Sequence, residues 1–114
     1  MSTPIALNSE NYASLDTGIQ DILKLGKRAL ITIYTDAAGT TIASDEHGDI
    51  NEREVLSISF TASYKDADGN DTNPFVVVKF TNGNGLFVDY FTTVDYVDDH
   101  WYKLSDKAIP SKTF

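Results

Sequence analysis

Residues 75–91, FVVVKFTNGNGLFVDYF, are two runs of β-branched and aromatic residues around the polar sequence NGNG. Asn and Gly tolerate the positive φ angles of tight turns, so this stretch predicts an antiparallel β-hairpin. Side chains alternate between the two faces of a strand, which places Val76, Val78 and Phe80 on one face. We expect this hairpin in the middle of the fold, with Phe80 fully buried.

The second run of the hairpin has apolar side chains on both faces. One face is expected to be apolar throughout, whereas the other carries Phe87 and Phe91 beside Asp89 and is only half polar. A sheet face that carries two Phe side chains is expected to be covered, by a helix or by a second subunit. Phe87 and Phe91 are therefore candidate partner-binding residues. The residues expected to share the apolar face are Leu86, Val88 and Tyr90.

Period-two patterns also occur before the hairpin. Residues 55–64, VLSISFTASY, alternate strictly, which predicts a strand with one buried and one hydrated face, as in an antiparallel sheet. Residues 29–36 predict another strand, and residues 40–44 can pair back with it after the turn DAAGT. The buried face of the 55–64 strand is expected to comprise Leu56, Ile58, Phe60, Ala62 and Tyr64.

A helical pattern precedes the strands. Apolar residues at spacings of three and four predict a helix from about Leu15 to Leu25, ended by Gly26. The fold class is thus α+β, mostly β, with one N-terminal helix followed by an antiparallel sheet of about five strands, as a meander or a small sandwich or barrel. A further short helix or strand is expected at residues 100–104. We expect one domain over residues 1–114, with a flexible N-terminal arm at about 1–9 and a C-terminal tail at about 108–114.

Charge and composition exclude several classes of protein. The 114 residues include nine Lys and Arg against 17 Asp and Glu, for a net charge of −8, and no basic cluster of the kind that nucleic-acid binding requires. The absence of Cys excludes disulfides and thiolate zinc sites. No signal peptide or membrane-spanning run is visible. We therefore expect a soluble protein made in the cytoplasm, without cofactor and without direct contacts to nucleic acid or membrane.

One loop resembles a calcium-binding sequence. In residues 64–75, YKDADGNDTNPF, the side chains of Asp66, Asp68 and Asn70 supply oxygen atoms at every second position. An EF-hand needs Gly at position 6 and Glu at position 12, but the chain has Asp71 and Val77 there. We interpret the stretch as a polar turn, with a weak calcium site at these three residues as the alternative.

Two histidines lie in acidic sequences, SDEHGD around His47 and VDDHWY around His100. A histidine beside carboxylates can bind zinc or act as a general base. The chain has no nucleophile elbow of the G-x-S-x-G type to accompany either one. Both are therefore interpreted as surface residues in polar loops, and the protein is expected not to be an enzyme.

Acidic and aromatic residues alternate near the C-terminal end. Asp95, Asp98 and Asp99, close to Trp101, predict an acidic and aromatic surface suited to a basic partner. These four residues join Phe87 and Phe91 as candidate partner-binding residues. The alternative is a hydrated acidic face that keeps the protein in solution.

A short cysteine-free chain rich in Thr, Asn, Asp and Gly, with β-hairpins and loose ends, resembles small bacteriophage structural and accessory proteins in general character. We therefore expect a non-enzymatic structural or interaction protein, a homo-oligomeric virion component of the head, neck or tail. It would bind copies of itself or other virion proteins, through an edge strand or through its two ends. The alternative is a small acidic inhibitor of a basic host or defence protein. The apolar residues available at the two ends are Ile5, Leu7, Ile109 and Phe114.

Overall fold

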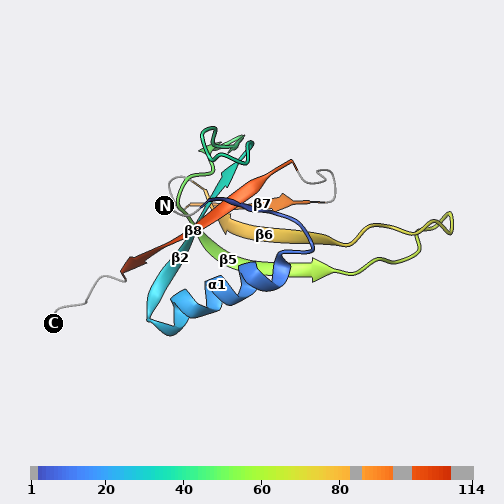
Figure 1. The fold of residues 1–114 in the computed structure, drawn as a ribbon, viewed down its shortest axis with the longest axis horizontal. Helices are drawn as coiled ribbons and strands as arrows, with labels where there is room; N and C mark the ends of the chain where they lie inside the picture. Colours follow the sequence, from blue (N-terminus) through green and yellow to red (C-terminus); the bar gives the residue numbers. More distant parts are fainter. Residues whose placement is uncertain (1–2, 83–85, 94–98, 109–114) are drawn as a thin grey trace.

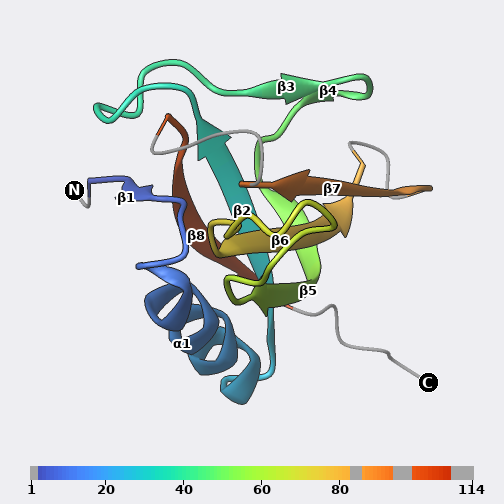
Figure 2. The ribbon, with the colours of Figure 1, turned by 90° about the vertical axis from the view of Figure 1, so that its right-hand side faces the viewer.

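A computed structural model describes residues 3–82, 86–93 and 99–108 and shows one helix with a mostly antiparallel set of strands (Figure 1). Six strands form one sheet in the order β1-β8-β2-β5-β6-β7, and β3 and β4 form a separate hairpin. The main sheet curls into a half-barrel (Figure 2). The predicted fold class is confirmed. The elements are β1 (Ile5–Ala6), α1 (Tyr12–Lys24), β2 (Lys27–Tyr34), β3 (Ser44–Asp45), β4 (Gly48–Asp49), β5 (Arg53–Thr61), β6 (Phe75–Thr81), β7 (Val88–Thr92) and β8 (Trp101–Ala108).

Helix α1 begins three residues before the predicted start and ends where the sequence indicates. Gly26 has a φ of +72°, the left-handed conformation that commonly follows a helix, and its N–H donates to the Leu23 carbonyl at 2.9 Å. The helix buries Leu15 and Ile19 against the sheet. Its amphipathic spacing is therefore explained by the single face that it turns toward the core.

The pairing of β2 with β8 brings together segments about 70 residues apart in the sequence. Eight residue pairs connect these strands, from Lys27 with Ala108 to Tyr34 with Trp101. The predicted short element at residues 100–104 is thus a full strand of eight residues. Residues 29–33 of β2 are all buried, which matches a strand covered on both faces rather than one with a hydrated face.

The predicted N-terminal arm is wrong for the residues that follow Pro4. Ile5 and Ala6 pair with Tyr102 and Trp101 as strand β1. Leu7 is buried in the core, and its N–H donates to the His100 carbonyl at 2.9 Å. A strand of two residues is too short to show an alternation of apolar and polar residues, so the sequence does not reveal it. At the other end, Ala108 still belongs to β8, and residues 109–114 lie outside the described residues.

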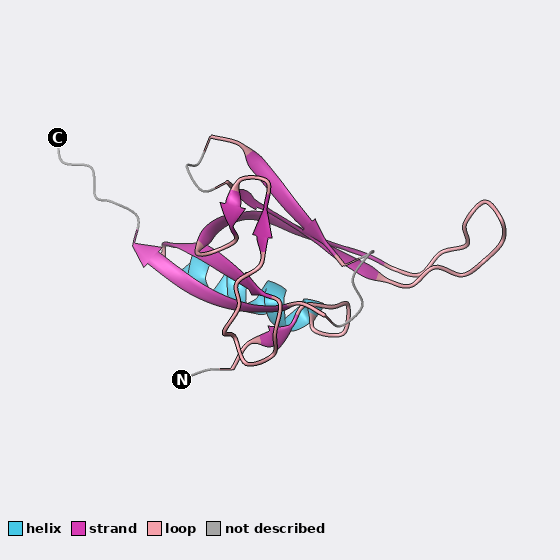
Figure 3. Ribbon diagram, turned by 90° about the horizontal axis from the view of Figure 1, so that it is seen from above, coloured by secondary structure: helices cyan, strands magenta, loops and turns pink. Residues whose placement is uncertain are grey.

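Strand β5 departs from the predicted alternation. A β-bulge between Val55 and Ser57 turns Leu56 to solvent, because an extra residue in one strand shifts its faces. Phe60 is half exposed and packs against Tyr12, with ring centroids 5.3 Å apart. The strand ends at Thr61, and residues 62–70 are exposed in a loop that projects beyond the sheet (Figure 3). The predicted burial of Leu56, Phe60, Ala62 and Tyr64 is therefore wrong.

The β6–β7 hairpin is confirmed as antiparallel, and Phe80 is fully buried. Its expected central position is wrong, because β7 is an edge strand of the sheet. The predicted faces of β7 are also reversed. Asp89 and Phe91 point inward, because an ion pair with the buried Arg53 draws the Asp89 carboxylate to the core side. The side chains left exposed are Leu86, Val88 and Tyr90.

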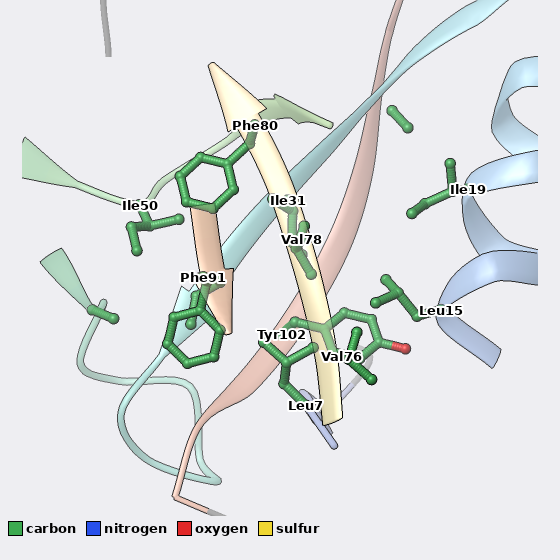
Figure 4. Packing of buried hydrophobic residues seen from close by; sticks show 13 residues of the cluster. Leu7, Leu15, Ile19, Ile31, Ile50, Val76, Val78, Phe80, Phe91 and Tyr102 are labelled. Atoms are coloured by element: carbon green, nitrogen blue, oxygen red, sulfur yellow. The ribbon is translucent and has the colours of Figure 1, made fainter. Parts of the chain in front are cut away.

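The core fills the concave side of the half-barrel (Figure 4). Leu15 and Ile19 enter it from α1, and Val76, Val78 and Phe80 line it from β6. The buried hydrophobic cluster comprises Leu7, Leu15, Ile19, Ala29, Ile31, Ile33, Ala43, Ile50, Val76, Val78, Phe80, Phe91 and Tyr102. Contributions from α1, from strands β2, β6, β7 and β8, and from the segments at Leu7, Ala43 and Ile50 make this one continuous core.

Replacing Phe80 by Ala should lower the free energy of unfolding by about 3–5 kcal/mol, because it leaves a large cavity in this core. Ser59→Ala, on the exposed face of β5, should change it by no more than about 0.5 kcal/mol. Urea denaturation of both variants measures the two values. A Ser59 variant less stable than the Phe80 variant would contradict the faces described for β5 and β6.

Candidate functional site

A buried arginine connects three parts of the fold. Arg53 is the first residue of β5, and its side chain is only 2% exposed. Its Nη1 donates to a carboxylate oxygen of Asp45 at 2.6 Å and of Asp89 at 3.1 Å. Its Nη2 donates to the second Asp45 oxygen at 3.1 Å and to the Gly48 carbonyl at 2.9 Å. The guanidinium therefore links β5 to the β3–β4 hairpin and to β7.

The local sequence of the β3–β4 hairpin presents the Asp45 carboxylate to this arginine. Ser44 pairs with Asp49 and Asp45 with Gly48, so the turn is only two residues long. Gly48 has a φ of +109°, which a residue with a side chain rarely adopts. The His47 N–H donates to Asp45 Oδ1 at 2.8 Å and orients the carboxylate. This short turn fixes the acid and the histidine next to each other.

His47 closes the cluster from the solvent side. Its Nδ1 lies 2.9 Å from each oxygen of Asp89, and its ring stacks on Phe87 with centroids 5.9 Å apart. A histidine held by a carboxylate is the arrangement that orients an imidazole for proton transfer. In the part of the chain that the structure describes, however, no Ser, Thr or Lys side chain is hydrogen-bonded to the His47 ring. The contacts observed hold the hairpin onto β7.

The same residues offer a possible metal ligand set. One ligand atom from each of Asp45, His47 and Asp89 lies within 4.8 Å of the other two. The Arg53 guanidinium, however, already binds both carboxylates and supplies the positive charge that a metal ion would bring. A divalent cation would have to sit beside this buried charge, so we interpret the cluster as an ion-pair network.

The cluster changes the titration of Asp45. Partial burial raises the pKa of this carboxyl, but the hydrogen bonds from Arg53 and from the His47 N–H outweigh it, together with the positive charge of Arg53. The net result is a pKa below the ordinary value for Asp. The ionised form of Asp45 is therefore favoured in the folded protein.

A pocket of about 540 Å³ lies beside the cluster. One wall is formed by residues 43–46, around β3, and the other by residues 88–92, the whole of β7. Ile50 and His100 complete the lining. The sequence does not indicate this pocket, because its walls come from segments more than 40 residues apart. The one signal for the cluster is the charged Asp89 within an apolar run.

The predicted calcium ligands lie at the tip of the projecting β5–β6 loop. One carboxylate oxygen of Asp66 accepts the N–H groups of Asp68, at 3.0 Å, and Asn70, at 2.9 Å. The Gly69 N–H donates to the Asp66 carbonyl at 3.0 Å. These bonds close the loop as a turn, which is the preferred interpretation of the sequence. Calcium binding at Asp66, Asp68 and Asn70 stays a prediction.

The six predicted partner-binding residues are not all surface residues. Phe91 is buried, with its ring centroid 4.8 Å from that of His100, and only Phe87 of the two phenylalanines is exposed. Trp101 is partly buried in β8, and Asp99 is exposed and paired with His100 at 3.0 Å. The expectation of an exposed His100 is wrong, since its side chain is mostly buried. Asp95 and Asp98 lie outside the described residues.

Comparison with known proteins found no matching family model, no similar curated protein and no similar solved structure. Among the described residues, no helix is long and apolar enough to cross a membrane.

Replacing Arg53 by Met should lower the free energy of unfolding by about 3–5 kcal/mol, because it leaves the partly buried carboxylates of Asp45 and Asp89 without their cation. Arg28→Met is the matched control, since Arg28 is exposed and its nearest contact with Glu54 is 3.8 Å, so about 1 kcal/mol or less is expected. Urea denaturation at neutral pH compares them. Equal losses of unfolding free energy in the two variants would show that the ion pairs of Arg53 do not stabilise the fold.

Stability should also depend on the charge of Asp45 in acid. Because the pKa of Asp45 is lower in the folded than in the unfolded protein, its contribution is complete above the unfolded pKa of about 3.9. The contribution is lost as the pH falls through the lower, folded pKa. Urea denaturation from pH 7 to pH 3 should therefore show a steeper loss for the parent protein than for Asp45→Asn. Asp71→Asn, at an exposed pair with Lys65, should follow the parent curve.

Proposed function

We propose that this chain is a non-enzymatic structural or interaction protein that assembles with further copies of itself. The observation that carries the proposal is a group of exposed apolar side chains along the edge strand β7, here called the β7 surface. Contiguous exposed apolar residues on a folded domain are typical of a protein interface. The β7 surface comprises Leu86, Val88 and Tyr90.

The position of these residues supports assembly rather than chance exposure. Within the described residues β7 pairs only with β6, so its other edge has no neighbouring strand. Proteins usually protect such an edge with Lys, Pro, a bulge or a covering element, because an open edge pairs with other chains. Strand β7, with the sequence VDYFT, has none of the first three. The inward-pointing Asp89 and the attached β3–β4 hairpin protect this edge in part, and a covering partner would protect it fully.

The proposal extends to the setting in which such a protein assembles. Its character as a short, cysteine-free chain rich in Thr, Asn, Asp and Gly supports a small bacteriophage virion component of the head, neck or tail. The support for this finer assignment is the sequence, and the support for self-association is the β7 surface. The two parts are tested separately, the first by incorporation into particles and the second by mass in solution.

Self-association should be visible in solution and should depend on β7. Size-exclusion chromatography with light scattering should show an oligomer, and Val88→Lys should shift it toward monomer because a Lys on an edge strand opposes strand pairing. Leu25→Lys is the matched control, since Leu25 is 69% exposed just after α1, away from β7. A parent protein that stays monomeric at high concentration would contradict the proposal.

The alternative function, an acidic inhibitor of a basic protein, makes a different prediction about salt. The net charge of −8 favours association with a basic surface, and such binding weakens as ionic strength rises. Self-association that buries the apolar β7 surface is expected to weaken less in high salt than such a complex. A complex with a basic protein that dissociates at about 0.5 M salt, from a chain that is otherwise monomeric, would favour the inhibitor.

A further inference from the structure

The pocket beside β7 is lined by all five residues of this edge strand. It lies between the edge strand and residues 43–46, has the buried Ile50 in its lining and has a volume of about 540 Å³. Figure 2 shows the β3–β4 hairpin above β7, and the ion pairs of Arg53 with Asp45 and Asp89 link the two segments. A site bounded lengthwise by a strand admits a chain lying parallel to that strand.

The backbone of β7 offers hydrogen bonds toward this space. The Asn82 N–H donates to the Phe87 carbonyl and the Thr93 N–H to the Val76 carbonyl, so Phe87 and Thr93 point their backbone groups to β6. Alternate residues of a strand direct their N–H and C=O groups to opposite edges. Val88 and Tyr90 therefore present theirs to the open edge. An added strand can bind there by main-chain hydrogen bonds.

The walls of the pocket set the chemistry of the segment. Asp45, Glu46 and Asp89 contribute three carboxylates, against the single guanidinium of Arg53. Ala43, Ile50 and Phe91 contribute apolar surface. A segment that suits this pocket carries a basic and an apolar side chain on one face and no acid.

The chain itself contains such a segment. Residues 107–114 read KAIPSKTF, with two lysines, an isoleucine, a phenylalanine and no acid. In an extended conformation Lys112 and Phe114 point to the same side, because side chains alternate along a strand. Pro110 precedes this part, and a proline is tolerated at the start of an edge strand.

The geometry of β8 excludes that residues 109–114 fill the pocket of their own chain. His100, which lines the pocket, directly precedes β8, and Ala108, eight residues further along this extended strand, lies about 26 Å from it. Six extended residues reach at most about 20 Å. Residues 109–114 are therefore too short to return along β8 and also lie in the pocket. A second copy has no such limit, because its position is free.

We propose that residues 109–114 of a second copy bind in this pocket as a strand added to the open edge of β7. Lys112 then faces the carboxylates of the pocket, and Phe114 covers the apolar part. Each copy both offers a segment and receives one, so the contact can form a closed ring or an exchanged dimer. This inference rests on the proposed self-association and names the contact that produces it.

The first test uses a fluorescent peptide of the sequence KAIPSKTF and a chain that ends at Ala108. Fluorescence anisotropy should show saturable binding, weakened about tenfold by Phe114→Ala in the peptide because an apolar side chain leaves the pocket. Glu46→Lys in the protein should weaken it about fivefold, whereas Glu10→Lys, the same change on an exposed residue near α1, should not. Equal binding of a peptide with these residues in scrambled order would overturn the inference.

The second test uses the full chain and separates this inference from the proposed function. Light scattering should show an oligomer for the parent and a monomer for the shortened chain, with thermal denaturation confirming that both are folded. Lys112→Glu in the full chain should also dissociate it, and combination with Glu46→Lys should restore it. If the parent is an oligomer and the shortened chain remains one, this inference is wrong while the proposed function stands. A monomeric parent overturns both.

Discussion

The ion pairs of Arg53 are the interaction on which the arrangement around β7 depends. A guanidinium that is nearly inaccessible to water needs compensation, and its two Nη groups receive it from Asp45, Asp89 and the carbonyl of Gly48, whereas Nε has no hydrogen-bond partner. The three partners come from three different segments. The requirement to neutralise one buried charge therefore fixes the position of the β3–β4 hairpin relative to the start of β5. It also determines which side of β7 points to the core.

This requirement explains why the apolar residues of β7 face outward. Once the Asp89 carboxylate is drawn inward, the alternation of the strand sends Phe91 in with it and turns Val88 and Tyr90 to solvent. An edge strand with an apolar outer face and an acidic inner flank is the result. The proposed assembly and the proposed segment contact both use this one consequence of a buried ion pair.

The sequence predicts the helix and strands of this fold better than it predicts which side of each strand is buried. The helix, the end at Gly26 and the β6–β7 hairpin follow from local periods and turn residues, which the chain expresses strongly. The burial of Phe80 follows from the same alternation. These features depend on neighbours in the sequence, so a single sequence is sufficient to find them.

The errors all arise from contacts between distant residues. The inward turn of Asp89 depends on Arg53, 36 positions earlier, and the bulge after Val55 depends on the match of β5 to β6. Strand β1 is defined only by its pairing with β8. The candidate cluster was missed for the same reason, because Asp45, Arg53 and Asp89 show no common motif spacing. Only the two histidines were singled out, and of these only His47 belongs to the cluster.

The position of β8 in the sheet affects the order in which the protein can fold during its synthesis on the ribosome. This strand lies between β1 and β2, yet it is synthesised after every other described strand. Until it emerges, β1 and one edge of β2 have no partner, and Leu7 cannot reach its place beside His100. The nascent chain can form α1 and the β5–β6–β7 meander early, but the sheet closes only when residues 101–108 are released. Folding of the sheet is thus completed only after β8 is synthesised, by contacts between residues far apart in the sequence.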